Sequence, residues 1–194
     1  MAITQRTTLP LEHGTFSIAF HRFEEKEYCL SVSYGELKKG TPIIRLHSSC
    51  LFGEALHSLD CDCAPQLTAT LKMIAEYGQG TIIYEYAEGR GIGLEKKLQA
   101  LAIQQHEKVD TVEAFKMMSL PPDTRSYEVA IMALNDLKVA RTLRLVTQNP
   151  AKLNAIKEAG FEVAEVMNPK ITVTPYNKPE LLTKKNKLGY MINI

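Results

Sequence analysis

The sequence has almost no net charge, no long apolar run and few cysteines, and each absence excludes a class of protein. A formal net charge of +1 over 194 residues provides no general attraction to nucleic acid or to an anionic membrane surface. No apolar run is long enough to span a bilayer, and the first residues, MAITQRTTLPLEHG, contain no apolar core of signal-peptide length. We therefore expect a cytoplasmic protein that binds neither nucleic acid nor membrane.

The few cysteines are unevenly placed. Cytoplasmic thiols stay reduced, so a structural disulfide is not expected. Cys29 lies among apolar residues and is predicted to be a packed thiol. Cys50, Cys61 and Cys63 crowd into one short region, RLHSSCLFGEALHSLDCDC, and this grouping predicts either a metal site or a chance cluster of buried cysteines.

The first part of the chain predicts β-structure. A hydrophobic fraction of 45% and a charged fraction of 23% are ordinary for a globular protein. Residues 14–23 and 27–37 alternate apolar and polar side chains around a charged turn at 24–27, which is typical of antiparallel strands, and residues 41–49 predict a third strand. Residues 64–78 have helical spacing and end at Gly78, and residues 80–86 predict a buried strand.

The second part of the chain alternates helices and strands. Residues 87–106 predict a glycine-rich turn that runs into an amphipathic helix, and Asp110 with Glu113 forms a capping-box pattern. A helix is predicted to start at Asp123; residues 142–160 predict a strand, a polar turn and a helix, and residues 161–166 a short strand. We predict an α/β fold, a single mixed α/β domain with a β-rich N-terminal portion, over residues 1–170, with a polar C-terminal tail over residues 171–194 that drapes over this body.

The spacing of the cysteine group indicates which kind of metal site it would form. C-x10-C-x-C lacks the two separated pairs of a zinc finger or ribbon. Three close thiolates fit the other zinc class, in which an open position holds a water that zinc makes nucleophilic, as in deaminases that attack a nucleobase ring. His47 or His57 is a possible fourth ligand. The residues alone leave the chance cluster open as the alternative.

Several motifs occur together in one order. The main motifs are RLHSSC with LDCDC, YAEGRGIGL and LVTQNPAKL. The same chain also contains LEHGTFSIAF, DTVEA, PPDTRSY and YNKPELLTKKNKLGY. In this order and spacing the chain resembles GTP cyclohydrolase II, the first committed enzyme of riboflavin synthesis, over nearly its whole length. The resemblance implies a homodimer, dependent on zinc and magnesium, that opens the imidazole ring of GTP, loses C8 as formate and releases pyrophosphate.

The resemblance also implies roles for individual residues. Cys50, Cys61 and Cys63 match the zinc ligands, and Asp123 and Arg125 match the proton acceptor and the nucleophile. The positions that match nucleotide contacts are Arg45, His47, Ser48, Gln66, Glu88, Gly89, Arg90, Thr111, Thr147 and Lys152.

Elementary chemistry supports some of these roles and offers a simpler explanation beside each. Arg90 follows a glycine turn at a predicted helix start, where backbone N–H groups favour phosphate, but it also fits a solvated surface arginine. Thr147 at a strand end and Lys152 in the next helix form a phosphate-shaped corner, although a lysine there is often plain surface charge. Taken alone, Asp123 fits a helix N-cap and Arg125 an exposed first-turn residue.

Six positions depart from the pattern of the family. Ser49 and Ser126 stand where an acid is expected, Ala87 where a glutamine is, Gln99 where an arginine is, Leu101 where a tyrosine is and Phe115 where an asparagine is. The metal and phosphate ends of the site are retained, whereas the lining between them is less polar, and loss of a polar partner changes discrimination strongly.

We predict a zinc hydrolase acting on GTP. The alternatives are a divergent paralogue, which stops at the formylated intermediate or opens another nucleotide's ring, and a non-catalytic zinc-containing nucleotide-binding protein. Retention of the three thiols with Asp123 and Arg125 favours an enzyme.

Overall fold

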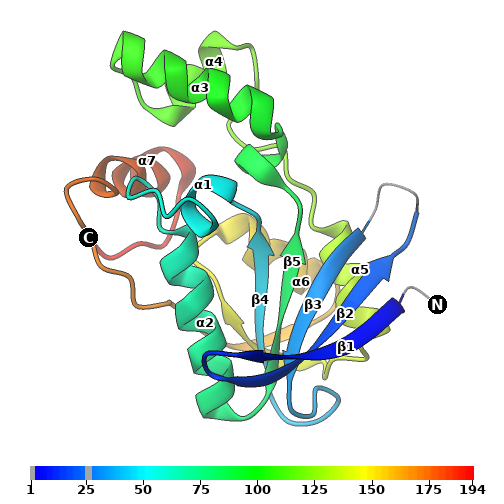
Figure 1. Ribbon diagram of the computed structural model, residues 1–194. Helices are drawn as coiled ribbons and strands as arrows, with labels where there is room; N and C mark the ends of the chain where they lie inside the picture. Colours follow the sequence, from blue (N-terminus) through cyan, green and yellow to red (C-terminus); the bar gives the residue numbers. More distant parts are fainter. Residues whose placement is uncertain (1–2, 25–27) are drawn as a thin grey trace. The chain divides into compact units, whose positions relative to one another are not determined.

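Alternating apolar residues build one seven-stranded mixed sheet, seen in a computed structural model that describes residues 3–24 and 28–194 (Figure 1). The strand order is β1-β2-β3-β5-β4-β6-β7. The strands are β1 (Ile3–Leu11), β2 (Gly14–Arg22), β3 (Tyr28–Tyr34), β4 (Ile43–Ser48), β5 (Gly80–Glu85), β6 (Thr142–Val146) and β7 (Glu162–Met167). The pairs β1–β2, β2–β3 and β3–β5 are antiparallel, whereas β4–β6 and β6–β7 are parallel.

Helical segments connect and follow these strands. In the described residues they are α1 (Leu51–Glu54), α2 (Cys63–Tyr77), the 3-10 turn η1 (Glu88–Gly91), α3 (Leu94–Glu107), α4 (Thr111–Met117), α5 (Glu128–Asp136), α6 (Pro150–Glu158) and α7 (Lys178–Leu188). Among these helices, none has both the length and the apolar composition to cross a membrane. The predicted fold class, a mixed α/β domain with its strands concentrated in the N-terminal part, is confirmed.

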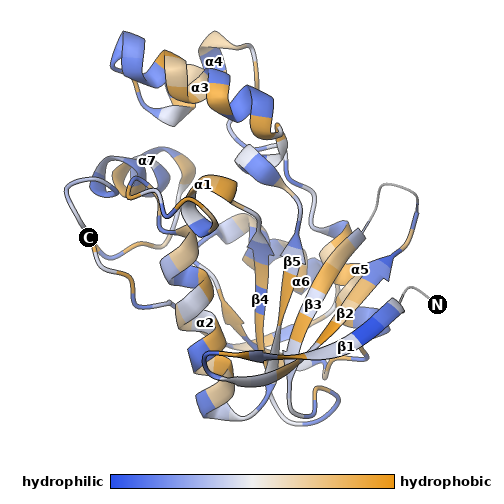
Figure 2. Ribbon diagram, in the orientation of Figure 1, coloured by the Kyte–Doolittle hydropathy of each residue, from blue (hydrophilic) through white to orange (hydrophobic). Residues whose placement is uncertain are grey.

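The period of two along each strand divides the core between the two faces of the sheet. Ile43 of β4 and Ile82 of β5 pack in one apolar cluster with Ile74 of α2, and their neighbours Ile44 and Ile83 pack in the other, with α5 and α6. The middle of β5, with Ile82 and Ile83, and much of α5 are accordingly orange in Figure 2. Helices on both faces explain why nearly every residue of the central strands β4 and β5 is buried.

The chain forms two compact units that alternate along the sequence. The sheet unit comprises the residues up to His47, Gln66–Tyr86 and Tyr127–Lys170. The helical unit comprises Ser48–Pro65, Ala87–Ser126 and Ile171–Ile194, and it has a small apolar core of its own around Ala100, Ala114 and Phe115. Residues 171–194, predicted to be a polar tail, contain the helix α7. They belong to the same compact unit as Cys50, Cys61 and Cys63.

Most predicted elements are present, and their ends have physical causes. α2 ends before Gly78, whose φ of +90° only glycine adopts readily and whose N–H donates to Ile74 O at 2.9 Å. Asp110 caps α4, because its side chain accepts hydrogen bonds from Val112 N and Glu113 N. Strand β1 and helices α1 and α7 were not among the predicted elements, and the predicted turn at 24–27 lies largely outside the described residues.

One predicted helix start is wrong. The helix expected from Asp123 begins at Glu128, with Tyr127 as its N-cap. The Asp123 side chain instead accepts a hydrogen bond from the backbone N of Arg125, 3.1 Å away, which folds a local turn before the helix. In both an N-cap and such a turn, the aspartate side chain accepts a hydrogen bond from the backbone N–H two residues later. The sequence around Asp123 therefore did not distinguish the two structures.

A buried histidine makes the stability of the sheet unit depend on pH. His21 on β2 is fully buried, with Nδ1 3.1 Å from Asp136 Oδ2 and Nε2 2.9 Å from Ser31 Oγ. Burial lowers the pKa of His21 below its ordinary 6.5, and this outweighs the opposing effect of Asp136. The unfolded chain therefore binds more protons than the folded one near this pH, so we expect the free energy of unfolding to fall as pH drops below about 6.5.

Replacing this histidine should weaken the pH dependence. We expect His21→Gln to lower the free energy of unfolding at pH 7.5 by about 1–3 kcal/mol, because buried hydrogen-bond partners lose their contacts. The decline between pH 7.5 and 5, measured by urea denaturation, should then be shallower than in the wild type. His106→Gln, an exposed histidine, is the control. Equal slopes in wild type and His21→Gln would contradict the assignment.

Candidate metal centre and active site

The three predicted metal ligands meet in the helical unit. Cys50 caps the N-terminus of α1, with its Sγ accepting a hydrogen bond from Gly53 N at 3.4 Å, and Cys63 opens α2. The Sγ atoms of Cys50, Cys61 and Cys63 all lie within 4.8 Å of one another, and those of Cys50 and Cys61 are 3.7 Å apart. Three sulfur donors this close fit the thiolate set that zinc prefers.

A glycine leaves room for this group. A Cβ atom at Gly53 would overlap Cys61 Sγ and would lie 3.3 Å from Cys50 Sγ. Any side chain at this position would therefore fill the space around the thiols. The short helix α1 can approach the group only because residue 53 has no side chain.

The pKa values of the three thiols shift in different directions. Hydrogen bonds from Cys61 and Cys63 hold the pKa of Cys50 well below its usual range. The hydrogen bond to Cys50 raises the pKa of Cys61 to about 11, and the pKa of Cys63 is raised for the same reason. Cys61 and Cys63 are therefore harder to deprotonate than Cys50, and metal binding by the three thiols would have to displace their protons.

A lysine and a glutamate lie directly beside Cys50. Lys97 Nζ on α3 is 3.3 Å from Cys50 Sγ and also donates to Glu88 Oε1, while Glu88 Oε2 accepts a hydrogen bond from Leu51 N at 2.8 Å. Burial works to lower the pKa of Lys97, but the Glu88 hydrogen bond and the charge of Cys50 outweigh it and raise this pKa. Lys97 stays protonated and places a positive charge against the thiolate. Sequence reasoning did not identify Lys97.

Of the two histidines proposed as a fourth ligand, neither is shown to be one. His57 is exposed and, among the described residues, is not part of the metal-ligand group. His47 belongs to the sheet unit, where its Nδ1 accepts a hydrogen bond from Arg45 Nε at 3.0 Å.

Asp123 and Arg125 form an ion pair with each other. Arg125 Nε donates to Asp123 Oδ1 at 2.9 Å, and Nη2 donates to Asp123 Oδ2 and to Tyr190 Oη. Burial works to raise the pKa of Asp123, but the hydrogen bonds and charge of Arg125 outweigh it and hold this pKa below its usual range. Asp123 is therefore a carboxylate at neutral pH, and the Arg125 side chain is only 9% exposed. Neither the N-cap role nor the exposed first-turn role holds.

The ion pair is connected to the metal-ligand region. Arg125 Nη1 donates to Ser48 Oγ at 3.3 Å, and Ser48 lies two residues before Cys50. Ser48, Cys50, Asp123 and Arg125 are thus predicted site residues that share one compact unit.

Arg90 is held by a carboxylate from α7. It lies in η1, four residues before α3 starts, with φ +57°, so the expected place at a helix start is wrong. Its Nη2 is 2.6 Å from Glu180 Oε1, and its guanidinium lies 5.8 Å from the Phe115 ring centroid. The side chain is 10% exposed, which excludes a solvated surface arginine. Phe115, one of the departures from the family pattern, thus packs in the small core under this arginine.

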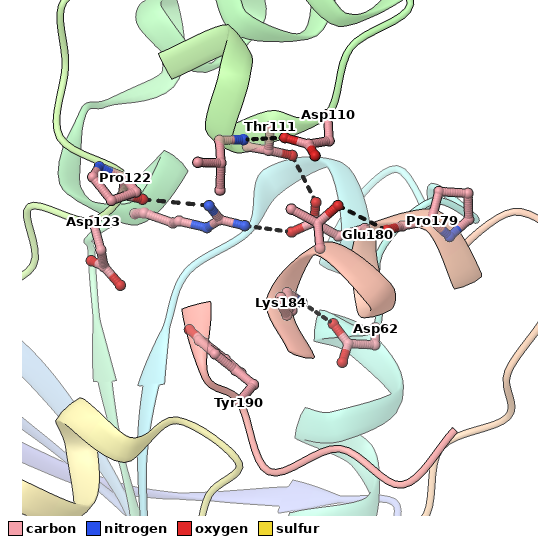
Figure 3. A network of polar contacts seen from close by, with 12 residues as sticks. Asp62, Asp110, Thr111, Pro122, Asp123, Pro179, Glu180, Lys184 and Tyr190 are labelled. Carbon is pink, nitrogen blue, oxygen red and sulfur yellow. Dashed lines mark hydrogen bonds and ion pairs between the residues drawn. The ribbon is translucent and has the colours of Figure 1, made fainter. Parts of the chain in front are cut away.

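Thr111 shares the same carboxylate. Thr111 Oγ1 donates a hydrogen bond to Glu180 Oε2 at 2.7 Å, whereas Arg90 contacts the other carboxylate oxygen, Oε1 (Figure 3). Two predicted nucleotide contacts, one on η1 and one on α4, therefore converge on one anionic group. An arginine and a hydroxyl that bind a carboxylate together are also suited to bind phosphate oxygens.

Other predicted contacts lie in the sheet unit. Arg45 donates from Nη2 to Gln66 Oε1 and from Nε to His47 Nδ1, and the His47 ring lies 5.5 Å from that of Tyr84. Arg45 and His47 are both buried, so three predicted nucleotide contacts form one hydrogen-bonded group at the end of β4 and the start of α2.

The predicted phosphate corner is more buried than expected. Lys152 Nζ donates to Leu46 O at 2.8 Å, and the residue is 7% exposed, so it is not plain surface charge. Thr147 directly follows β6, and its Oγ1 accepts a hydrogen bond from Asn149 N at 3.1 Å. Because β4 and β6 are parallel, their carboxyl ends lie at the same edge of the sheet, the edge at which open α/β sheets bind ligands.

Sequence reasoning also missed the residues on and after α7. Glu180 forms an ion pair with Arg90, and Lys184 forms one with Asp62. Tyr190 Oη accepts a hydrogen bond from Arg125. Burial works to lower the pKa of Lys184, but the carboxylates of Asp62 and Glu180 outweigh it and raise this pKa. The available signal was the spacing of Glu180, Lys184 and Lys187 by four and three residues, which places them on one face of a helix.

Comparisons with known proteins show what the chain is similar to over most of its length. A family model described as GTP cyclohydrolase II matches residues 2–168. A GTP cyclohydrolase-2 of Actinobacillus succinogenes is 40% identical over 99% of this chain and 90% of its own length. A GTP cyclohydrolase-2 of Archaeoglobus fulgidus is 43% identical over 95% of this chain, and a riboflavin biosynthesis protein RibBA of Aquifex aeolicus is 42% identical over 94%. This chain spans only 48% and 45% of those two relatives.

Proposed function

Because the chain belongs to the GTP cyclohydrolase II family, we propose that it is a zinc hydrolase that opens the imidazole ring of GTP, with release of formate and pyrophosphate. The observation that carries the proposal is the presence, in one compact unit, of three thiols within 4.8 Å and the Asp123–Arg125 ion pair. A protein that only bound nucleotide would not need three clustered thiols together with a paired carboxylate and arginine in the same unit.

The thiol group would hold the zinc. Cys50, Cys61 and Cys63 supply three sulfur donors, and the absence of a side chain at Gly53 keeps space around them. A zinc ion bound there supplies an activated water near neutral pH. Lys97 beside Cys50 offsets the negative charge of the thiolates, and Glu88 holds Lys97 in place.

The ion pair would move a proton and stabilise charge. Asp123 is ionised and half-buried beside Arg125, so it can accept a proton during attack on the ring. Arg125 is fixed by Asp123, Ser48 and Tyr190, and a guanidinium held in this way is suited to bind phosphate oxygens. A guanidinium this well paired stays charged, so we assign Arg125 an electrostatic role in phosphate cleavage.

The remaining predicted contacts would bind the nucleotide. Arg90 and Thr111 already bind one carboxylate, which supports contacts to phosphate, and magnesium would bridge the phosphate oxygens. Glu88 would accept hydrogen bonds from the guanine N1–H and amino group. We assign further contacts to Gly89 in the helical unit and to Arg45, His47, Gln66, Thr147 and Lys152 in the sheet unit.

We also propose how the chain is organised. Residues 1–170 form the catalytic domain, and residues 171–194 are a C-terminal tail that contributes contacts to the site. A homodimer is supported by exposed apolar side chains on α3 and α4, among them Leu98 and Met117. Light scattering should then give twice the chain mass of 21.7 kDa.

The function is tested by product analysis. Zinc-loaded protein is incubated with magnesium and GTP, and the products are identified by mass spectrometry. We expect one formate and one pyrophosphate for each GTP consumed. A product that keeps the formyl group would favour the divergent paralogue and would implicate Gln99 and Leu101, which stand where the family has an arginine and a tyrosine. Binding of GTP without turnover would favour the non-catalytic alternative.

A further inference from the structure

A carboxylate is buried within the proposed metal loop. Asp62 lies between Cys61 and Cys63, and its side chain is only 1% exposed. A buried carboxylate is costly unless a cation or hydrogen-bond donors compensate it. Its ion-pair partner is Lys184 of α7, whose Nζ is 2.7 Å from Asp62 Oδ1 and whose side chain is 13% exposed (Figure 3).

Helix α7 is fixed on both sides of this lysine. One turn earlier, Glu180 binds Arg90 and Thr111, and nearly one turn later Lys187 Nζ lies 2.7 Å from Asp110 Oδ2. Between these contacts Leu181 is buried. The position of the Lys184 side chain is therefore determined by a helix that is held at several points, not by a flexible tail.

The negative charges near the thiol group favour a cationic side chain at position 184. Three thiolates around one divalent zinc leave a net negative charge, and Asp62 adds a second one in the same loop. Lys97 Nζ lies 3.3 Å from Cys50 Sγ, and Lys184 Nζ lies 2.7 Å from Asp62 Oδ1. Groups that contact the ligand-bearing segments fix ligand orientation and commonly change metal affinity when they are removed.

We propose that Lys184 is a positioning residue for the metal centre, fixing the Cys61–Cys63 loop through Asp62 in the geometry that lets three thiolates bind one zinc. This inference rests on the proposed function, because it presumes that the thiol group binds zinc. It gives α7 a defined part in metal binding, although no residue of this helix is a proposed ligand.

The test is zinc affinity, measured by competition with a chromophoric chelator. Lys184→Met keeps most of the length of the side chain and removes its charge, and we expect zinc to bind about 10- to 100-fold more weakly. Lys184→Arg should recover part of the loss. Lys185→Met is the matched control, because Lys185 is on the same helix and its Nζ donates to Ile194 O at 3.2 Å. We expect this variant to bind zinc like the wild type.

A second variant separates positioning from folding. If Lys184→Met alone does not fold, Asp62→Asn/Lys184→Met removes both buried charges and should fold, and it should also bind zinc weakly. Where the single variants fold, the double variant should be no weaker than either one, because both act through one contact. The visible spectrum of the cobalt-substituted protein should change in each of these variants, which a role confined to holding α7 would not cause.

Two results would overturn parts of this account, and they differ. Wild-type zinc affinity and an unchanged cobalt spectrum in Lys184→Met or in the double variant, with or without lower thermal stability, would refute the positioning role alone. A wild-type protein that binds no zinc would refute the metal centre in the proposed function.

Discussion

Replacing Cys61 and Cys63 together by serine will remove zinc from the protein and abolish its hydrolase activity. The variant retains one thiol of the three that lie within 4.8 Å of one another. Serine hydroxyls are poor zinc ligands compared with thiolates, and without the metal the attacking water returns to its ordinary pKa far above neutrality. We expect about one zinc per wild-type chain, essentially none in the variant, and a fall in GTP turnover of at least about 1,000-fold.

Folding and thiol chemistry both need controls in this experiment. The far-ultraviolet circular dichroism of the variant should match the wild type, because the sheet and its two apolar clusters contain neither cysteine. Cys29→Ser is the matched control. Cys29 is a buried thiol whose pKa burial raises to about 12, and we expect this variant to keep its zinc. If the double variant binds zinc as tightly as the wild type, the metal lies elsewhere.

Replacing Arg125 by alanine should have the second largest effect. The change removes the guanidinium that pairs with Asp123 and contacts Ser48 and Tyr190. We expect pyrophosphate release to fall about 100- to 1,000-fold, because a fixed charge that stabilises a transition state contributes that much. GTP binding, measured by calorimetry, should survive in part through the other nucleotide contacts.

Two further variants show whether the loss is specific to this guanidinium. Arg125→Lys keeps the charge without the forked geometry, so its activity should stay well below the wild type. Arg141→Ala removes an arginine that packs over the Phe161 ring in the sheet unit, and pyrophosphate release should remain normal. Near-normal release in Arg125→Ala would limit Arg125 to holding Asp123 and the segment around Tyr190.

Much of the sheet was predictable because its signals are local. Alternation in β2 and β3, the apolar run of β5 and the glycine that ends α2 each need only a few neighbouring residues to be recognised. The grouping of Cys50, Cys61 and Cys63 was also visible from spacing. The chemistry assigned to Asp123 and Arg125 came from family resemblance instead, since the isolated residues fitted simpler roles equally well.

The remaining features depend on contacts between distant parts of the chain. α7 buries Leu181, and its lysines and glutamate make ion pairs with Arg90, Asp62 and Asp110. The burial of Lys152 likewise depends on a carbonyl group of β4, 106 residues earlier in the chain. Local pattern does not show which distant residue each of these side chains contacts, so surface charge remained the simpler explanation for Lys152 beside its predicted phosphate contact, and residues 171–194 were predicted as a tail without the contacts of α7.

The division of the helical unit into three chain segments has an evolutionary consequence. Ser48–Pro65, Ala87–Ser126 and Ile171–Ile194 are separated by segments that build part of the sheet, so any continuous fragment that contains both Cys50 and Lys184 also contains the strands β5, β6 and β7. An exchange of one continuous gene segment that transferred the cysteine group together with Lys184 would also transfer these three strands. The parts of this metal centre would have to be inherited together with the strands between them, and each segment could change in length or sequence only while its contacts to the other two were kept.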